Sequence, residues 1–281
     1  MGSSTEWVTA YVGLALGRIA AAGPFPRARR AAERAADWLR SNRSYAAGWG
    51  YNGATGVDAD STGFALRLLR LVGAEVADAD QAQLLSAWRA GGGFATYDEA
   101  SAWGDAHPCV TAAAYLALDG PERRLKLREL RAYLERTQLV DGRWPAYWWR
   151  THHYSSYHHL ALLRELGWTE DFQRPPHAPG AAATSSELAW SAGIAHLVGD
   201  SDAADRRTGR LLDRQLWDGR WPGGADLRVT DPACRTPWVE PAGDLYADGF
   251  GLLTTASVLD VFARILTHPS GPGPRTAEVS P

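Results

Sequence analysis

The sequence has few of the residues that mark several common classes of protein. Lys126 is its only lysine, and the formal net charge of −3 predicts no basic surface for nucleic acid. The two cysteines, Cys109 and Cys234, lie in no metal-finger spacing, which argues against a disulfide scaffold or structural zinc and favours the reducing cytoplasm. No apolar run is long enough to cross a membrane. The apolar stretch 7–22 carries Arg18 and is therefore predicted to be a core helix rather than a signal peptide.

Tryptophan, in contrast, is abundant, with 13 residues in a chain of 281. Large rigid aromatic side chains pack between helices, and they also line cavities for apolar or cationic ligands. A chain of this length buries one sizeable core, so we predict one domain over 1–268. Residues 269–281 are rich in proline, glycine and serine and are predicted to form a disordered tail.

The chain repeats two kinds of helical segment in alternation. One kind is apolar on nearly every side, with small residues interspersed, and is predicted to be buried all round; it occurs at 7–16, 60–69, 109–118, 154–163, 186–195 and 249–258. The other kind has one charged and one apolar face, and it occurs at 26–42, 79–90, 121–138 and 202–216. A fifth segment of this kind, near 168–173, would be very short, and a sixth is missing or merged into the chain ends. This alternation predicts an all-α (α/α)6 toroid with inner helices inside a jacket of outer helices; an open solenoid is the competing arrangement.

Two links between these segments share a motif. Residues 133–144 read YLERTQLVDGRW, and residues 211–221 read LLDRQLWDGRW. Both resemble the QW motif of the squalene-hopene and oxidosqualene cyclases and related class II terpene cyclases, and 38–50 and 87–97 are weaker versions. The glutamine can cap a helix end, the glycine permits a tight turn, and the tryptophan fills the gap between repeats. We therefore predict structural roles for Gln138, Gln215, Trp144 and Trp221.

A second resemblance carries chemistry. Residues 57–66, VDADSTGFAL, look like the DxDD segment of class II cyclases, in which the middle aspartate protonates an alkene or epoxide. The resemblance assigns that role to Asp60 and places Asp58 at the first acidic position. Ser61 replaces the last acid of the motif, which is a departure from it. Capping of a helix N-terminus is the alternative role for Asp58 and Asp60.

A second DxD pair, Asp78 and Asp80, opens an outer helix, where we expect N-capping and interaction with the helix dipole.

An acid that protonates an alkene must hold its proton at rest. Burial and a nearby like charge from Asp58 favour the neutral form of Asp60, whereas the helix N-terminus favours the carboxylate, and the pair is expected to titrate as a unit. The family often places a histidine or similar donor against this acid, and the candidates are His153, Tyr154, His158 and His107. The histidine-rich run 151–159 also leaves a metal site open as a weaker interpretation.

After protonation, positive charge moves along the isoprenoid, and aromatic faces stabilise it without trapping it. Aromatic residues in loops near the expected cavity mouth are candidates for substrate binding: Trp49, Tyr51, Trp103, Tyr147, Trp148, Trp149, Trp238 and Tyr246. Aromatic residues of the inner helices either line the ring or fill it: Phe64, Tyr115, Tyr154, Tyr157 and Trp190.

The resemblance implies a class II terpene or meroterpenoid cyclase, of lyase or isomerase type, acting on farnesyl or geranylgeranyl diphosphate or on a prenylated aromatic. The chemical step would need no cofactor and no protein-bound metal, and Mg2+ would accompany only a diphosphate. Loop arginines could grip such a group: Arg143, Arg150, Arg220, Arg228 and Arg235.

Two alternatives stay open. One is a non-catalytic isoprenoid-binding or scaffold module, and the other is a subunit like the zinc-dependent prenyltransferases, with Cys234 as a weak ligand candidate. Because two-barrel cyclases bury the active site at or near the junction of their barrels, a homodimer or partner domain could cover a lone barrel and exclude water.

Overall fold

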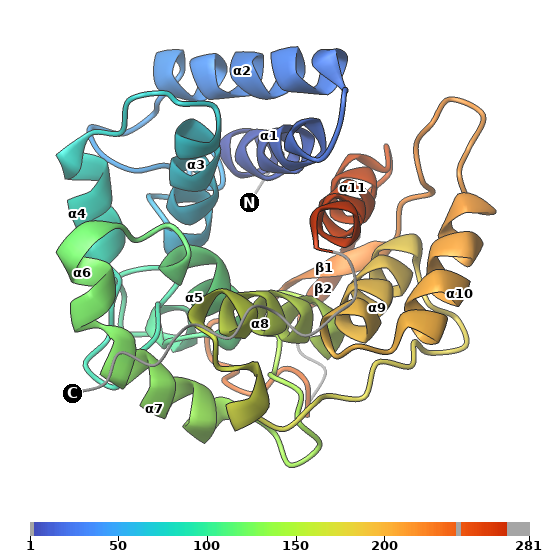
Figure 1. Ribbon diagram of the computed structural model, residues 1–281. Helices are drawn as coiled ribbons and strands as arrows, with labels where there is room; N and C mark the ends of the chain where they lie inside the picture. The colour runs from blue at the N-terminus through green and yellow to red at the C-terminus, as the bar shows by residue number, and fades with distance from the viewer. Residues whose placement is uncertain (1–2, 240–242, 269–281) are drawn as a thin grey trace, which may run out of the picture.

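Six apolar helices form the inner wall of a closed ring in the computed structural model, which describes residues 3–239 and 243–268 (Figure 1). They are α1 (Glu6–Ala21), α3 (Ala59–Leu71), α5 (Pro108–Tyr115), α8 (His152–Leu166), α9 (Ser185–Leu197) and α11 (Leu252–Thr267). Each contacts the next in this order, and α11 packs back against α1. Every residue of α5 and α9 is buried, as expected for helices that are apolar all round. The predicted all-α toroid is confirmed.

The outer layer follows the amphipathic segments with two differences. It consists of α2 (Pro26–Ser41), α4 (Asp78–Ser86), α6 (Gly120–Leu125), α7 (Leu127–Thr137), α10 (Ser201–Leu212) and the short η2 (Thr169–Asp171). The segment expected as one helix over 121–138 is divided at Lys126. The helix expected over 79–90 ends at Ser86 because Trp88 turns away to pair with Phe94 across a bend that contains Gly92 and Gly93, both at positive φ. No outer helix follows α11 within the described residues.

The QW motifs act as staples between the two layers. In each, the glutamine amide donates to a carbonyl at the tight turn: Gln138 Nε2 to Gly142 O at 2.9 Å and Gln215 Nε2 to Gly219 O at 2.8 Å. The indole Nε1 of each buried tryptophan donates to a carbonyl ten residues earlier in the chain, from Trp144 to Leu134 and from Trp221 to Leu211. Their predicted structural roles are confirmed, and the weaker motif repeats the bond from Trp49 to Leu39.

The second DxD pair does not cap its helix. Ala77 is the N-cap of α4 and makes no side-chain capping bond. Asp80 is buried instead and accepts hydrogen bonds from the Gly48 amide (2.8 Å) and from Arg43 (2.6 Å). The predicted capping role of Asp78 and Asp80 is therefore wrong, because Asp80 satisfies the donors of a neighbouring loop.

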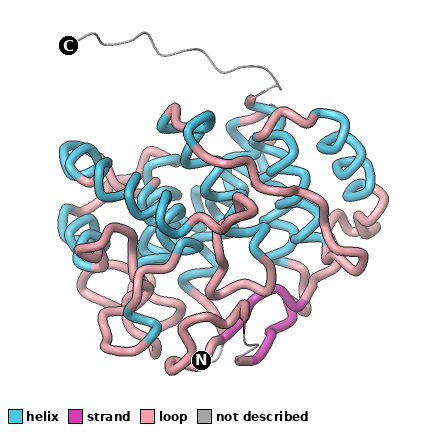
Figure 2. Tube along the Cα trace, turned by 90° about the horizontal axis from the view of Figure 1, so that it is seen from below, coloured by secondary structure: helices cyan, strands magenta, loops and turns pink. Residues whose placement is uncertain are grey.

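Two short strands, which the sequence did not predict, lie across one end of the ring. β1 (Ala225–Val229) pairs antiparallel with β2 (Asp244–Ala247), and its other edge bonds to the loop before α8 through Arg150 N to Asp226 O and Arg228 N to Trp148 O. Figure 2, viewed at 90° to Figure 1, shows both strands at one end of the molecule together with many of the loops. This end holds the start of α3 and therefore positions the candidate site.

Both cysteines are free, as expected. In the part of the chain that the structure describes, no helix is long and apolar enough to cross a membrane. The predicted tail, 269–281, lies outside the described residues.

Candidate active site

Asp58 and Ser61 fix the start of α3. Asp58 is the N-cap residue, and its Oδ1 accepts from the Ser61 amide at 2.6 Å while its Oδ2 accepts from the Ser61 hydroxyl at 2.7 Å. Both oxygens of Asp58 are thus engaged as acceptors. The capping alternative is correct for Asp58, and Ser61, at the departure from the DxDD pattern, serves that cap rather than facing the cavity.

Asp60 lies in the first turn of α3 with a different environment. Its Oδ2 accepts a hydrogen bond from the indole Nε1 of Trp7 at 2.7 Å. Its Oδ1 is buried and has no hydrogen-bond partner among the residues that the structure describes. A carboxylic acid needs one oxygen free to carry its proton, and only Oδ1 meets that condition here. The arrangement therefore suits a protonated Asp60 with the proton on Oδ1.

The electrostatics of the pair agree with this assignment. Burial, followed by the negative charge of Asp58, raises the pKa of Asp60 to about 8, against the opposing effects of the Trp7 hydrogen bond and Arg67. Burial also raises the pKa of Asp58 to about 7, and its bonds to Ser61 oppose that shift. Because both oxygens of Asp58 accept hydrogen bonds, Asp60 is the member of the pair that keeps a proton at neutral pH.

Asp60 lines a cavity between the start of α3 and β1. Of the aromatic residues predicted from the sequence, Tyr51, Trp148 and Trp149 line it. Asp58 also lines it, and Arg228, predicted only as a loop arginine, lies in its wall. The rest of the wall was not predicted and consists of Trp7, Thr96, Tyr97, Leu227 and Val229. The cavity volume is about 50 Å³, well below the roughly 300–1,000 Å³ of ligand pockets. Binding of a prenyl chain therefore requires side chains around it to move.

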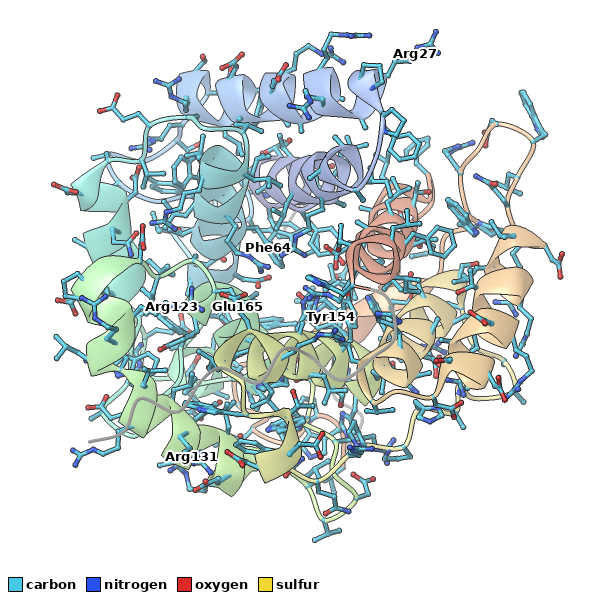
Figure 3. The ribbon with its side chains drawn as sticks, in the orientation of Figure 1. Arg27, Phe64, Arg123, Arg131, Tyr154 and Glu165 are labelled. Atoms are coloured by element: carbon cyan, nitrogen blue, oxygen red, sulfur yellow. The ribbon has the colours of Figure 1, made fainter. Side chains whose placement is uncertain are left out.

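Aromatic side chains fill the middle of the ring below this cavity. Phe64 and Tyr154 point into the centre (Figure 3), and both are buried. Tyr154 stacks on Trp149 with ring centroids 3.9 Å apart, and Tyr11 meets Phe64 edge-to-face at 5.0 Å. The sequence left open whether the inner-helix aromatic residues line the ring or fill it, and the structure shows that Phe64 and Tyr154 fill it.

Seven other predicted binding residues do not line the cavity. Trp49 is sealed in the core, Tyr147 donates to the Cys234 carbonyl at 2.9 Å, and Trp103 donates to the Thr230 carbonyl at 3.0 Å. The others are Tyr157, which donates to Asp260 at 2.8 Å; Trp190, which meets Trp149 edge-on; Trp238, which packs near His152; and Tyr246, which is half exposed on β2.

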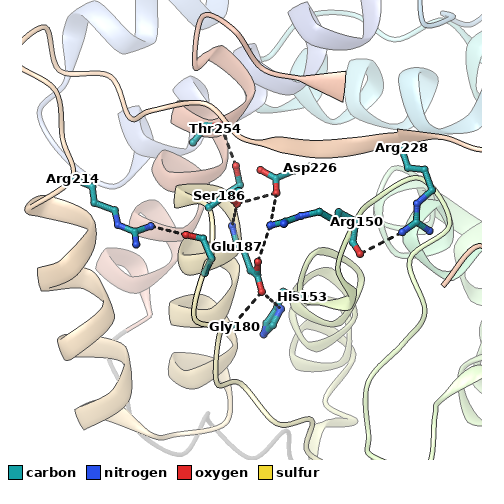
Figure 4. Close-up of polar contacts among 11 residues, drawn as sticks. Arg150, His153, Gly180, Ser186, Glu187, Arg214, Asp226, Arg228 and Thr254 are labelled. Carbon is teal, nitrogen blue, oxygen red and sulfur yellow. Dashed lines mark hydrogen bonds and ion pairs between the residues drawn. The ribbon is translucent and has the colours of Figure 1, made fainter. Parts of the chain in front are cut away.

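The histidine expected beside the acid lies elsewhere. His153 faces Glu187, with Nδ1 and Oε1 3.4 Å apart, in a buried polar cluster where Arg150 contacts both Glu187 and Asp226 (Figure 4). Trp7 occupies the place beside Asp60 for which His153, Tyr154, His158 and His107 were the candidates. Burial also lowers the pKa of His107 to about 3, and that of His158 well below its usual range, so both are neutral.

The loop arginines separate into paired and unpaired groups. Arg143, Arg220 and Arg235 pair with nearby aspartates, and Arg150 pairs with Glu187 and Asp226. Of these five arginines, Arg228 alone lines the cavity. Within the described ranges its Nη1 has no hydrogen-bond partner, and its Nη2 reaches only the Arg150 carbonyl at 3.4 Å. Among the described residues there is no group of three or more histidines, cysteines or acids that could hold a metal ion.

No protein-family model and no curated protein matches the chain. Among solved structures, the apo form of the type II terpene cyclase MstE from Scytonema is similar, with 29% identity and a TM-score of 0.76 over 94% of this chain and 88% of that one. MstE variants have also been solved with geranylgeranyl dihydroxybenzoate as substrate and with merosterolic acid A as product. A protein from Actinoplanes is 26% identical with a TM-score of 0.78, over 94% of this chain and 91% of that one.

The ent-copalyl diphosphate synthase from Streptomyces platensis shares the fold at 18% identity and a TM-score of 0.62; the match covers 93% of this chain and 50% of that one.

Proposed function

On the premise that this chain is a class II terpene cyclase, we propose that it cyclises a prenylated aromatic acid and that Asp60 supplies the initiating proton. Two observations of Asp60 carry the proposal: its buried Oδ1 has no hydrogen-bond partner among the described residues, and the residue lines a cavity walled mainly by aromatic rings. Asp60 and the cavity lining are parts of the proposal, supported by geometry and by the raised pKa of Asp60.

The first step moves one proton and one electron pair. The π electrons of the distal alkene form a new C–H bond with the proton on Oδ1, which leaves a tertiary cation on the substrate and a carboxylate at Asp60. Each following alkene attacks the cation and closes a ring. The cascade ends when the final cation loses a proton or captures water. Neutral His158, which lies close to Phe64 and Tyr154, is a candidate to accept that proton.

The surrounding residues favour this transfer in two ways. Before it, burial and Asp58 keep the acid protonated. After it, the Trp7 indole and the N-terminus of α3 stabilise the carboxylate that forms. Trp149 and Trp148 present rings to the cavity and stabilise the cation without forming a covalent adduct.

The substrate class follows from the neighbours. MstE, whose variants were solved with geranylgeranyl dihydroxybenzoate, is similar to this chain over 94% of its length. We therefore infer a geranylgeranylated or farnesylated aromatic acid, with no cofactor in the chemical step; Mg2+ would serve only a diphosphate. The cytoplasm as compartment and a homodimer covering the cavity remain predictions.

The test compares Asp60→Asn with the wild type on geranylgeranyl dihydroxybenzoate. The variant keeps size and polarity but has no transferable proton, so we expect it to bind the substrate and to form cyclised product at least about a thousandfold more slowly. Asp78→Asn, which changes an exposed acid of the other DxD pair, is the matched control and should leave product yield unchanged. Product yield from Asp60→Asn equal to that of the control would refute the role of Asp60.

A further inference from the structure

A second cavity lies at the opposite end of the ring, where the inner helices end. Its volume is about 310 Å³, and it is lined by Arg18, Arg67, Arg70, Glu165 and three leucines. Three cationic side chains and one anionic side chain thus share an otherwise aliphatic wall. Such a cavity offers a carboxylate or phosphate both charge and planar hydrogen-bond donors.

Arg67 is the lining arginine without a compensating anion. Arg67 is only 8% exposed, and among the described residues its one hydrogen-bond partner is the Ala113 carbonyl at 3.5 Å. No carboxylate lies within ion-pair distance of it among the described residues. Arg18 by contrast pairs with Asp260, and Arg70 lies 3.9 Å from Asp119 and bonds to Gln81 and to the Ala117 carbonyl. A buried guanidinium in this state is costly unless an anion joins it.

The surrounding charges further favour binding of an anion beside Arg67. Burial, together with the positive charges of Arg18 and Arg264, lowers the pKa of Arg67 to about 9, although Asp260 and Glu165 act in the opposite direction. Glu165 is itself bonded to Arg123, and the two lie side by side in Figure 3. The protein therefore leaves positive charge at this end of the ring uncompensated.

Arg67 and Asp60 lie on the same face of α3, separated by seven residues or two helical turns. At about 1.5 Å of rise per residue, they stand about 10 Å apart along the helix. Phe64 lies between them, and the Arg67 guanidinium sits 5.9 Å from its ring centroid. A ligand along the ring axis would thus meet an acid at one end, aromatic rings in the middle and a cation at the other end, and a geranylgeranyl chain must be folded to fit between them.

We infer that the cavity around Arg67 binds the anionic head group of the substrate, so that the prenyl chain runs past Phe64 to Asp60. This inference rests on the proposed function and deepens it by fixing the direction in which the substrate lies. The chain takes the place of contacts among the central aromatic rings, which then line it. The head group is a carboxylate or a diphosphate, because both are anions that accept paired hydrogen bonds from a planar guanidinium.

Arg228 is the competing anchor, because it also lacks an ion-pair partner within the described part of the chain. It shares the cavity of about 50 Å³ with Asp60. A head group bound there would occupy the place that the distal alkene must reach. The position of Arg67, beyond the aromatic column, keeps the two ends of the substrate apart.

The test measures equilibrium binding in an Asp60→Asn background, where turnover does not interfere. The probes are geranylgeranyl dihydroxybenzoate, its methyl ester and geranylgeranyl diphosphate. With Arg67→Gln added, we expect the Kd of the acid to rise about tenfold to a hundredfold while that of the ester stays unchanged. Arg67→Lys should restore part of the loss, and Arg27→Gln, which removes an exposed arginine of α2 that points away from the ring in Figure 3, should change neither.

Each binding result either supports the inference or overturns it. A loss for the acid alone assigns a carboxylate site, and a parallel loss for the diphosphate assigns a general anion site; both support the inference. Equal losses for acid and ester, or an acid-specific loss produced by Arg228→Gln and not by Arg67→Gln, would overturn it. A lowered Tm of Arg67→Gln together with unchanged acid binding would show a structural role and would also overturn it. Binding of the acid without any product from the wild type would instead count against the proposed function.

Discussion

One oxygen atom of Asp60 distinguishes it from the neighbouring acid. The Asp58 oxygens both accept hydrogen bonds from Ser61, whereas Oδ1 of Asp60 accepts none. Two aspartates two positions apart therefore take different roles, one as helix cap and one as proton donor. The difference arises from what each side chain meets rather than from its chemistry.

The protonated state of Asp60 affects folding stability in a defined direction. Its pKa is about 8 in the folded chain, against an ordinary value of 3.8 for an exposed aspartate. The folded state therefore binds more protons between these values, and stability falls as pH rises through that window. Asp60→Asn removes the effect. The variant should match the wild type near pH 4 and exceed it by about 1–3 kcal/mol at pH 8. Urea unfolding at both pH values measures the difference in free energy of unfolding between the variant and the wild type. The same difference at pH 4 and at pH 8 would contradict the prediction.

The Trp7 indole should tune the acid. Its hydrogen bond lowers the pKa of Asp60 and stabilises the carboxylate that forms after proton transfer. We expect Trp7→Phe to lower kcat about tenfold to a hundredfold. Its alkaline limb in the pH–rate profile should also move to higher pH. Trp217→Phe, at a fully exposed indole, is the control; an alkaline limb that stays in place would rule out the role of Trp7.

Sequence reasoning located Asp60 and Asp58 but not their partners. The DADST motif, followed by an apolar helix, marks a helix start, which the structure confirms at Asp58. Trp7 is 53 positions away from Asp60 in the chain, and only ring closure brings them together. Trp7 lies at the start of the first inner helix, as Asp60 lies at the start of the second. This matching position was the one feature of the sequence that could have indicated their contact. His153 was misplaced because its helix presents it to Glu187.

Among the structural elements, side-chain hydroxyl groups of four inner helices accept hydrogen bonds from the loops that precede those helices. The amides of Trp49, Phe94, Trp144 and Trp221 donate to Thr62, Thr111, Ser156 and Thr255, respectively. Each link thus starts its inner helix against a side-chain acceptor, which is buried in every case except the partly exposed Thr255. The small polar residues in otherwise apolar segments, visible in the sequence as part of the repeat, have this function.

Thr111→Val tests the hydrogen bond from the loop amide of Phe94 to the inner helix. Valine has nearly the shape of threonine but leaves the buried Phe94 amide without an acceptor, so we expect a loss of about 1–3 kcal/mol in the free energy of unfolding. Thr267→Val, at an exposed threonine whose hydroxyl bonds only within its own helix, should cost less than about 0.5 kcal/mol. Chemical denaturation of both variants measures the two losses in free energy of unfolding, and equal losses would argue against a stabilising role for this hydrogen bond.

The two strands could not be predicted from their sequence. β1 reverses the usual pattern, because Asp226 and Arg228 are its buried positions and Leu227 is only half buried. Its polar side chains are satisfied by distant residues, as in the contact of Asp226 with Arg150. A period-two pattern of apolar residues is the signal for a strand, and it is absent here.

At the scale of the whole molecule, the ring closes where the last helix meets the first. The Tyr11 and Ser257 hydroxyls lie 2.9 Å apart, and Arg18 pairs with Asp260. The alternation of apolar and amphipathic segments was sufficient to predict this ring. It could not predict that the centre is filled, because side-chain direction within helices buried all round has no signature in the sequence.

Asp260→Asn tests the closure. Despite its burial, Arg18 and Arg264 hold the pKa of Asp260 well below its usual range, so its stabilisation is present above the unfolded pKa and is lost as pH falls through the folded value. We expect the variant to lose about 3–5 kcal/mol at pH 7, because Arg18 is left unpaired. The difference from the wild type should shrink below about pH 4. Thermal unfolding at pH 7 and pH 3 checks this, and a constant difference would contradict it.

The central claim is that cyclisation begins with a proton from the Asp60 carboxyl, which exchanges with solvent. The most direct measurement is the mass of the product formed by the wild-type enzyme from geranylgeranyl dihydroxybenzoate in D2O. We expect one deuterium on a carbon that belonged to the distal alkene, located by NMR. A cyclised product without deuterium at that carbon would contradict it.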